Sequence, residues 1–490
     1  MQYLIILGVF MLKKYWKSFN MPIYLYLITY FILSLLGILF LIFDNQEYLA
    51  MYEYMCGVAR PVIDSPHKRY ILIGLSILCP LLLSMFFFFA NKFISKLSKL
   101  EELLKKIPLE KRVNNLVIYF LTFLAYMYVI YSFNNIVGLH NLIYAFTNYN
   151  THISARFLLF NATTSPFFWV VFYSFIPVFS GYLYLQEENK KRKFLIGSLL
   201  FLISLLTLQK KYPLLFIFFL FLLNFLKERK IICFKNIFLI TSSGIVFSLL
   251  TILPSKYLTP EIKFEYQVPK KIDRSEEEKT TINDLDKIYQ NNKGLLEKSK
   301  TLSKKQHAQT RMYFDGELLK KLYPILALVN RSSITNAYYV EIFPDLHPFI
   351  GLDWTYFFPF KNSFNEGKFL WRFLNGNFAA DGGASVVPFQ YSIFSRAGLL
   401  SAFLVSGLVG LLLGGIWGLI SKIAAEDYKI LFQAIICIFF VYLSIDTLKS
   451  SLYAGYGMVV WAVIVFIIIG INFLHSLLTG KLNEANSTKS

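Results

Sequence analysis

The chain has 490 residues, of which 56% are hydrophobic and only 16% are charged, and its formal net charge is +19. A soluble protein of this length would need more polar surface, so the composition excludes an ordinary soluble enzyme and favours a membrane protein. The positive charge by itself would suit nucleic-acid binding, but its placement along the chain argues against that class.

Apolar stretches close to the roughly 20 residues that span a bilayer recur along the chain, and in hydrocarbon each must be a helix. We expect ten of them to cross the membrane: 21–43, 70–91, 116–137, 160–185, 194–208, 212–226, 237–254, 397–420, 430–447 and 457–476. Residues 1–12 are too short to span and no small-residue cleavage site follows, so we expect an interfacial or partial helix there.

The predicted fold is therefore all-α. It is a polytopic helical integral membrane protein with about 10–11 transmembrane helices and one large extracytoplasmic loop. The chain divides into an N-terminal transmembrane bundle (1–254), the large periplasmic loop (255–396), and C-terminal transmembrane helices with a cytoplasmic tail (397–490). Helix 397–420 contains several glycines, which predicts close packing on its neighbours.

The basic residues are concentrated in the segments predicted to face the cytoplasm. With the N-terminus inside, these segments are 1–20, 92–115, 186–193, 227–236, 421–429 and 477–490, and they hold 22 Lys or Arg against 9 Asp or Glu. This is the positive-inside pattern, and anionic lipid headgroups on that face explain the basic balance. We expect a multi-pass protein with both termini in the cytoplasm, a lipid bilayer around it, and no nucleic-acid partner.

Lys210 and Lys211 depart from this pattern, because they lie on the predicted outer side between two apolar runs. One explanation is that they are snorkelling residues at two helix ends. The other is that they bind an anion at the outer leaflet, since Pro213 suits the first turn of a helix and a helix N-terminus attracts anions. The sequence leaves both explanations open.

The outer segment 255–396 changes character near residue 310. Up to that point it is polar and rich in Lys and Glu, which predicts solvated helix or loop without a core. Asp284 and Asp286 have the spacing of a metal site, but so charged a segment produces this spacing by chance, and we expect no metal. An amphipathic stretch and an aromatic, proline-containing passage follow, of the kind that lies against a membrane or covers a cavity.

The aromatic passage contains a candidate acid–base pair. Pro344 and Pro348 flank Asp345 and His347, which favours a rigid turn that holds a histidine near a carboxylate. His347 can then act as a general base with Asp345 orienting it. The alternative is that His347 is an ordinary interfacial histidine.

Three stretches resemble the Wzy-type polymerases of O-antigen and other oligosaccharide repeat units in bacterial envelopes. They are the short basic turn between two helices (206–221), an Arg followed by an aromatic, Pro-rich passage (331–364), and a Gly-rich approach to a Gly-containing helix (382–415). The overall layout, with many helices and one large outer loop late in the chain, is also similar. Family members usually carry Arg in the mid-chain turn, where this chain has Lys210 and Lys211, and lysine lacks the bidentate fork of arginine.

The resemblance implies a glycosyltransferase at the outer face of the bacterial inner (plasma) membrane. Its substrate would be an undecaprenyl-pyrophosphate-linked oligosaccharide, and it would move the growing glycan from the lipid carrier onto a new repeat unit. The fold would be that of the C-type integral-membrane glycosyltransferases, and a chain-length-regulating co-polymerase is a further partner to test for.

The residues also fit this chemistry independently. A pyrophosphate leaving group needs positive charge as the bond breaks, and the acceptor hydroxyl needs a base or orientation. The sugar is already activated, so no metal or cofactor is required. The candidate pyrophosphate ligands are Lys210, Lys211, Arg331, Arg396 and Arg311; the candidate acid–base residues are His347, Asp345, Asp353 and Glu341; and Tyr338, Tyr339 and Trp354 suit sugar faces and the lipid chain.

Two other functions stay open. An O-antigen ligase, or another lipid-linked sugar transferase, would use the same donor with a different acceptor. A polysaccharide transporter or flippase would need ionisable residues in the middle of its helices, whereas the predicted helices are almost free of charge apart from Asp446 near one end. The sequence therefore favours chemistry at the outer surface.

Overall fold

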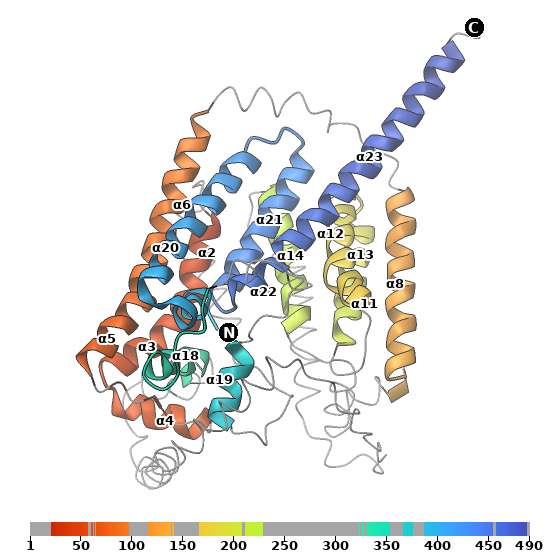
Figure 1. Ribbon diagram of the computed structural model, residues 1–490. Coiled ribbons are helices and arrows are strands. Elements are labelled where there is room, and N and C mark those ends of the chain that lie inside the picture. The colour runs from red at the N-terminus through yellow and green to blue at the C-terminus, as the bar shows by residue number, and fades with distance from the viewer. Residues whose placement is uncertain are drawn as a thin grey trace. The chain divides into compact units, whose positions relative to one another are not determined.

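The computed structural model of the chain is helical throughout the part that it describes (Figure 1). The described residues are 21–56, 60–61, 63, 65–97, 116–138, 140–141, 166–207, 211–228, 323, 326–327, 331–352, 366–375, 387–453 and 457–487. Every regular element within these ranges is a helix and none is a strand, which confirms the all-α fold class for them.

Within the described ranges, six helices are long and apolar enough to cross a membrane. They run over Met21–Ile42, Pro66–Ser95, Leu116–Ile136, Phe167–Gln186, Phe389–Ile420 and Leu448–Leu474. Each overlaps a span predicted from the sequence, so the chain is a polytopic helical membrane protein whose apolar helices suit a lipid bilayer.

Three of the other predicted spans fall on described helices that do not reach the same length and apolarity. Span 194–208 falls on α13 (Lys190–Leu205), span 212–226 on α14 (Lys211–Glu228) and span 430–447 on α21 (Glu426–Leu443), which begins with two acidic residues. Span 237–254 lies outside the described residues. The count of about 10–11 crossings therefore stays a prediction that rests on helix length.

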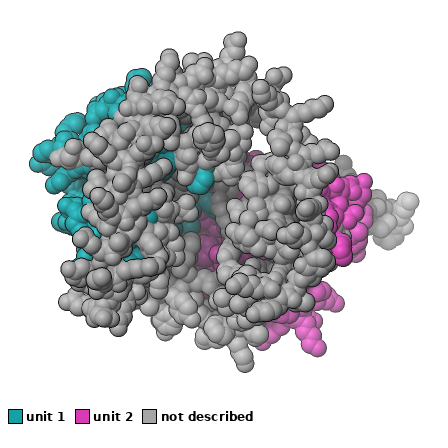
Figure 2. Space-filling model, turned by 90° about the horizontal axis from the view of Figure 1, so that it is seen from below, with its two compact units in different colours: residues 1–96, 273–418, 439–451 teal, residues 97–272, 419–438, 452–490 magenta. Residues whose placement is uncertain are grey.

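The chain forms two compact units, coloured separately in Figure 2. Unit 1 comprises residues 1–96, 273–418 and 439–451, and unit 2 comprises residues 97–272, 419–438 and 452–490. Each unit combines three segments that are separate in the sequence. The three-part division made from the sequence instead follows the expected position of each part relative to the membrane, and it stays a prediction.

Unit 1 contains two long helical rods that are each built from consecutive helices. The first rod is α2 (Met21–Tyr30), η2 (Phe31–Leu35, a π-helix) and α3 (Leu36–Ile42), and the second is α5 (Pro66–Ile73), η3 (Gly74–Leu78, a π-helix) and α6 (Cys79–Ser95). In the sequence α4 (Gln46–Cys56) connects the two rods. The unit also contains α18 (Arg331–Ile342), α19 (Glu366–Asn375), most of α20 (Phe389–Ile420), the end of α21 and most of α22 (Leu448–Tyr453).

The core of unit 1 joins the ends of both rods to the segments after residue 322. Helix α18 packs against η2, α3 and α5, and its Ile342 belongs to one buried apolar cluster with Leu41 and Leu72. Because α3 ends and α5 begins at this place, the predicted outer segments 44–69 and 255–396 meet at the same end of the unit. We call this end of unit 1 the α18 end.

Helices α6 and α20 of the same unit lie in very close contact. A Cβ atom built on Gly410 would stand 2.3 Å from the Leu83 carbonyl oxygen, and one built on Gly414 would stand 2.3 Å from the Phe87 carbonyl oxygen. Only glycine leaves room for a neighbouring backbone at this separation. The expected close packing of the glycine-containing helix is thereby confirmed.

Unit 2 contains α8 (Leu116–Ile136), α11 (Pro166–Val170), η4 (Val171–Phe175, a π-helix), α12 (Ile176–Gln186), α13, α14, most of α21, and α23 (Met458–Ser487). Contacts join four of the predicted cytoplasmic segments in this unit. Gln186 Nε2 donates to Asp427 Oδ2 at 2.5 Å, and Lys227 Nζ lies 3.9 Å from Asp427 Oδ1. Lys422 Nζ also donates to the Leu97 carbonyl oxygen at 2.6 Å. These contacts agree with a topology that places the segments on one side of the membrane.

Which side each end faces can be tested on the second rod of unit 1. We expect a membrane-impermeant maleimide to label His67→Cys in intact cells and to label Lys96→Cys only after the membrane is opened, because the exposed His67 and Lys96 stand at opposite ends of the rod. The measurement is the labelled fraction in a background without the native cysteines. The opposite pattern would place the α18 end in the cytosol and would contradict the predicted topology.

Candidate functional site

The turn after α18 contains the candidate pair Asp345 and His347. The backbone N–H groups of Leu346 and His347 both donate to the Ile342 carbonyl oxygen, at 2.8 and 3.0 Å, so a turn is present where the sequence predicts one. Asp345 Oδ2 forms an ion pair with Lys68 Nζ at 2.9 Å.

His347 is held separately from that carboxylate. Its Nδ1 lies 2.6 Å from the Pro348 carbonyl oxygen, and its ring makes edge contacts with Phe343 and Phe369. The structure therefore brings both residues into one turn but gives no hydrogen bond between their side chains.

The Lys68–Asp345 ion pair is expected to add little stability, because the two side chains are 19% and 53% exposed and solvent screens such pairs. We expect Asp345→Asn and Lys68→Gln each to lower the unfolding free energy by less than about 1 kcal/mol. Denaturation of the purified variants checks this. Glycan assembly is then compared between the two: a loss confined to Asp345→Asn would report a chemical role for the carboxylate, whereas equal behaviour would leave it a surface contact.

Two of the three aromatic residues expected to face sugar or lipid lie inside unit 1. Tyr338 and Tyr339 are both buried, and burial raises the pKa of Tyr338 well above its ordinary value. The Tyr338 ring packs edge-on against Phe373, and the Tyr339 hydroxyl donates to the backbone carbonyl oxygen of Glu366 at 2.7 Å. Glu341, near the end of α18, is half-buried.

Several of the predicted site residues are not among the residues that the structure describes. Lys210, Arg311, Asp353 and Trp354 lie outside the described residues, as do the side chains of Lys211 and Arg331, which are the first residues of α14 and α18. The helix start expected beside the lysine pair is nevertheless present, because α14 begins at Lys211.

Arg396 is the predicted cation whose surroundings are described most fully. Its Nε lies 2.5 Å from Glu366 Oε1, and the two side chains are each 4% exposed. The Ser392 hydroxyl donates to the same carboxylate oxygen at 2.9 Å. Two charges are therefore buried as a pair with a further hydrogen bond, which is the form in which buried charge is tolerated.

The ion pair stands at a break in α20. Ala397 (φ −145°, ψ 15°) and Gly398 (φ +79°, ψ −178°) leave the helical conformation, and the second is one that glycine adopts most easily. The freed carbonyl oxygens of Ser395 and Arg396 accept from the backbone N–H groups of Ile350 and Gly351, at 3.1 and 2.9 Å. The segment after α18 thus completes the broken helix. In membrane proteins such irregular backbone occurs where it is buried in protein or lines a cavity.

A third charged group joins the pair. Lys449, in α22 (Leu448–Tyr453), interacts electrostatically with both Arg396 and Glu366. Asp446, in the turn before α22, accepts from the Thr447 backbone N–H at 2.9 Å. Lys449 thus adds a second cation that influences the buried pair, and we call Arg396, Glu366 and Lys449 the break cluster.

Sequence reasoning singled out neither Glu366 nor Lys449, although each carries a local signal. Glu366 is the acidic residue in the first turn of a short helix whose apolar residues lie on one face, a favourable helix start. Lys449 stands in a short segment that the topology places outside, where the positive-inside pattern makes lysine scarce.

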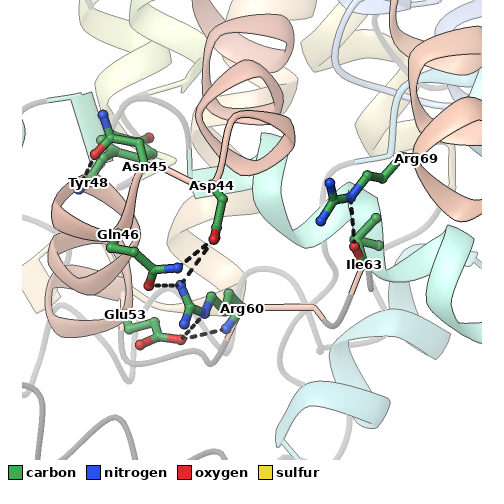
Figure 3. Close-up of polar contacts among 8 residues, drawn as sticks. All are labelled: Asp44, Asn45, Gln46, Tyr48, Glu53, Arg60, Ile63 and Arg69. Carbon is green, nitrogen blue, oxygen red and sulfur yellow. Dashed lines mark hydrogen bonds and ion pairs between the residues drawn. The ribbon is translucent and has the colours of Figure 1, made fainter. Parts of the chain in front are cut away.

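A second polar cluster at the α18 end, drawn in Figure 3, has a structural explanation. Arg60 Nη1 donates to Gln46 Oε1 at 2.7 Å, and Gln46 Nε2 donates to Asp44 Oδ1 at 2.7 Å. Arg60 also uses its backbone N–H, which donates to Glu53 Oε1 at 3.0 Å. Through these contacts Arg60, in the connection from α4 to α5, is held against α4, and the first residue of α4 is held to the loop before it.

Among the described residues, no group of three or more His, Cys, Asp or Glu side chains is arranged to hold a metal ion. Comparison with protein-family models, curated proteins and solved structures finds no match for the chain. A functional proposal must therefore stand on the residues and the geometry described above.

Proposed function

We propose that the chain is a glycosyltransferase that joins undecaprenyl-pyrophosphate-linked oligosaccharide repeat units into a polysaccharide at the outer face of the bacterial inner membrane, as a Wzy-type polymerase does. The observation that supports this best is the break cluster. A buried guanidinium at the broken start of a span, with a lysine that interacts with it electrostatically, suits the diphosphate of a lipid-linked donor.

The chemistry asks for positive charge more than for any other group. As the bond between sugar and diphosphate breaks, negative charge grows on the leaving oxygen, and Arg396 and Lys449 can stabilise it. Arginine suits phosphate because its planar fork gives two parallel hydrogen bonds. Under this proposal the α18 end faces outward, both termini lie in the cytoplasm, and the acceptor sugar approaches from the large loop.

The placement of charge favours this function over a flippase. Among the described residues, the buried charged side chains are Glu53, Glu366 and Arg396. Glu53 and Glu366 belong to α4 and α19, which are not candidate spans, and Arg396 stands near the start of its span. A transport pathway would instead place ionisable side chains in the middle of spans.

Glycan chain length tests the proposal. We expect Arg396→Ala to leave single repeat units on the final acceptor, while wild type and the control Lys368→Gln, an exposed position on α19, make long ladders. Arg396→Lys keeps the positive charge at this position. Ladders that persist in this variant would show that the loss in Arg396→Ala comes from the missing charge and not from misfolding. Ladders of normal length in Arg396→Ala at normal expression would refute the role of Arg396.

Gene deletion separates polymerase from ligase. A polymerase deletion leaves single repeats attached to the acceptor, whereas a ligase deletion leaves no attached glycan. The same assay applied to Lys210→Ala, Lys211→Ala and Arg331→Ala tests the remaining predicted pyrophosphate ligands.

A further inference from the structure

The partner of Arg396 comes from a different part of the chain than its span. Glu366 is the first residue of α19, and its carboxylate oxygen lies 2.5 Å from the guanidinium Nε. A carboxylate and a phosphate present the same kind of oxygen acceptor to a guanidinium. Glu366 therefore occupies Arg396 in the manner that an anionic ligand would.

We propose that Glu366 is an exchangeable stand-in for a phosphate-class anion at Arg396, and that the bound anion displaces the Glu366 carboxylate from the guanidinium. The proposal deepens the proposed function and rests on it for the identity of the natural ligand, a lipid-linked diphosphate. The binding chemistry itself follows from the break cluster alone.

The charges of the break cluster favour displacement of the Glu366 carboxylate by a diphosphate. With Glu366 in place, one carboxylate pairs directly with Arg396 and interacts electrostatically with Lys449. A diphosphate carries more negative charge than a carboxylate and can contact both cations, so it is the stronger partner for them.

Exchange also avoids an unpaired buried charge, which would be the main obstacle. The incoming anion keeps Arg396 paired. The displaced carboxylate keeps a donor in Ser392, which contacts it at 2.9 Å, and a cation in Lys449, which already interacts with it. No charge of the cluster has to be left alone.

Asn336 is a further buried polar side chain in unit 1, in addition to the ion pair. The Asn336 side chain is fully buried, and neither its nitrogen nor its oxygen has a hydrogen-bond partner within the described part of the chain. Asn336 precedes Tyr339 by three residues, so both lie on one face of α18, and Tyr339 bonds the Glu366 backbone. Buried amides normally bond, so this one is consistent with a polar ligand in the neighbourhood.

The test is titration of inorganic pyrophosphate into the full chain in phosphatidylcholine nanodiscs, followed by calorimetry. If Glu366 competes with the anion, Glu366→Gln should bind pyrophosphate about threefold or more tightly than wild type, a change readily resolved in Kd. Ser392→Ala, which weakens the hold on the carboxylate and is a mild substitution, should also bind more tightly. Arg396→Met should lose at least about tenfold in affinity, and Lys368→Gln should match wild type.

Weaker binding by Glu366→Gln and Ser392→Ala would overturn the exchange, since it would show that Glu366 orients Arg396 for the ligand. Unchanged binding in both would overturn it as well. If Glu366→Gln does not fold, the direction of the change in Ser392→Ala decides. Nanodiscs with phosphatidylglycerol give a second arm: competition there supports the exchange with a lipid headgroup as the phosphate source, and its absence supports a diphosphate ligand.

The outcome is separable from that of the proposed function. Tighter pyrophosphate binding by Glu366→Gln, together with normal ladders in Arg396→Ala, would uphold the anion exchange and refute the polymerase. Short glycans in Arg396→Ala, together with weaker pyrophosphate binding by Glu366→Gln, would uphold the polymerase and refute the exchange.

Discussion

Replacing Gly414 by alanine is expected to separate α6 from α20 and to destabilise unit 1 strongly. The new Cβ would stand 2.3 Å from the Phe87 carbonyl oxygen and 2.8 Å from its Cα. These are backbone atoms, so no side-chain rotation relieves the clash and one helix must move. Overpacking of this kind costs about 1–3 kcal/mol, and we expect the upper part of that range or beyond it. Gly410→Ala, which faces the Leu83 backbone at the same distance, should behave alike.

The same helix offers a matched control. A Cβ on Gly415 would meet nothing within 4 Å, so Gly415→Ala should be neutral or should gain up to about 1 kcal/mol from the higher helix propensity of alanine. The measurement is the unfolding free energy of each variant in mixed micelles. Equal stability of Gly414→Ala and Gly415→Ala would show that the two helices are not in this close contact.

The long apolar helices were the part of the fold that the sequence predicts well. A run such as Leu116–Ile136 can only be satisfied as a helix in lipid, and its length alone identifies it. The shorter apolar runs were harder to interpret. Helices α13 and α14 are shorter than the six candidate spans, so their length does not identify them as membrane crossings. Contacts with other helices, which composition does not report, decide whether such a helix is buried, tilted or spanning.

The start of α20 shows a different limit. The apolar pattern predicted a helix from residue 397, whereas the helix begins at Phe389 and breaks at Ala397 and Gly398. The break is possible because the Ile350 and Gly351 backbone N–H groups satisfy the carbonyls that it frees. A partner so distant in sequence leaves no local periodicity.

The candidate site was predictable in its residue types more than in its partners. Arg396 was identified as a cation near the outer end of a span, and the turn holding Asp345 and His347 is present. Their partners Glu366 and Lys68 could not be read from the sequence, because pairing depends on how α19 and α5 pack. The aromatic passage was ambiguous for a related reason: Tyr339 is as suitable for a buried core as for a sugar-binding surface.

Removing either partner of the Arg396–Glu366 pair is expected to have the largest effect on stability in unit 1. Both side chains are 4% exposed, so Arg396→Ala or Glu366→Ala leaves a buried charge without its direct ion-pair partner, at a cost of about 3–5 kcal/mol each. The double variant removes both charges and should cost far less than the sum of the two. A double-mutant cycle on the unfolding free energy measures this coupling, and additive losses would contradict the pairing.

The Lys68–Asp345 pair supplies the comparison within the same unit. It has good geometry at 2.9 Å but is partly exposed, so its coupling should stay below about 1 kcal/mol. The coupling energies of the two pairs are therefore expected to differ because of burial and not because of distance. The exchange proposed for Glu366 adds one requirement: at saturating pyrophosphate the Arg396–Glu366 coupling should fall, because the anion then takes the place of the carboxylate on the guanidinium. A coupling that stays the same with the anion bound would mean that Glu366 never leaves Arg396.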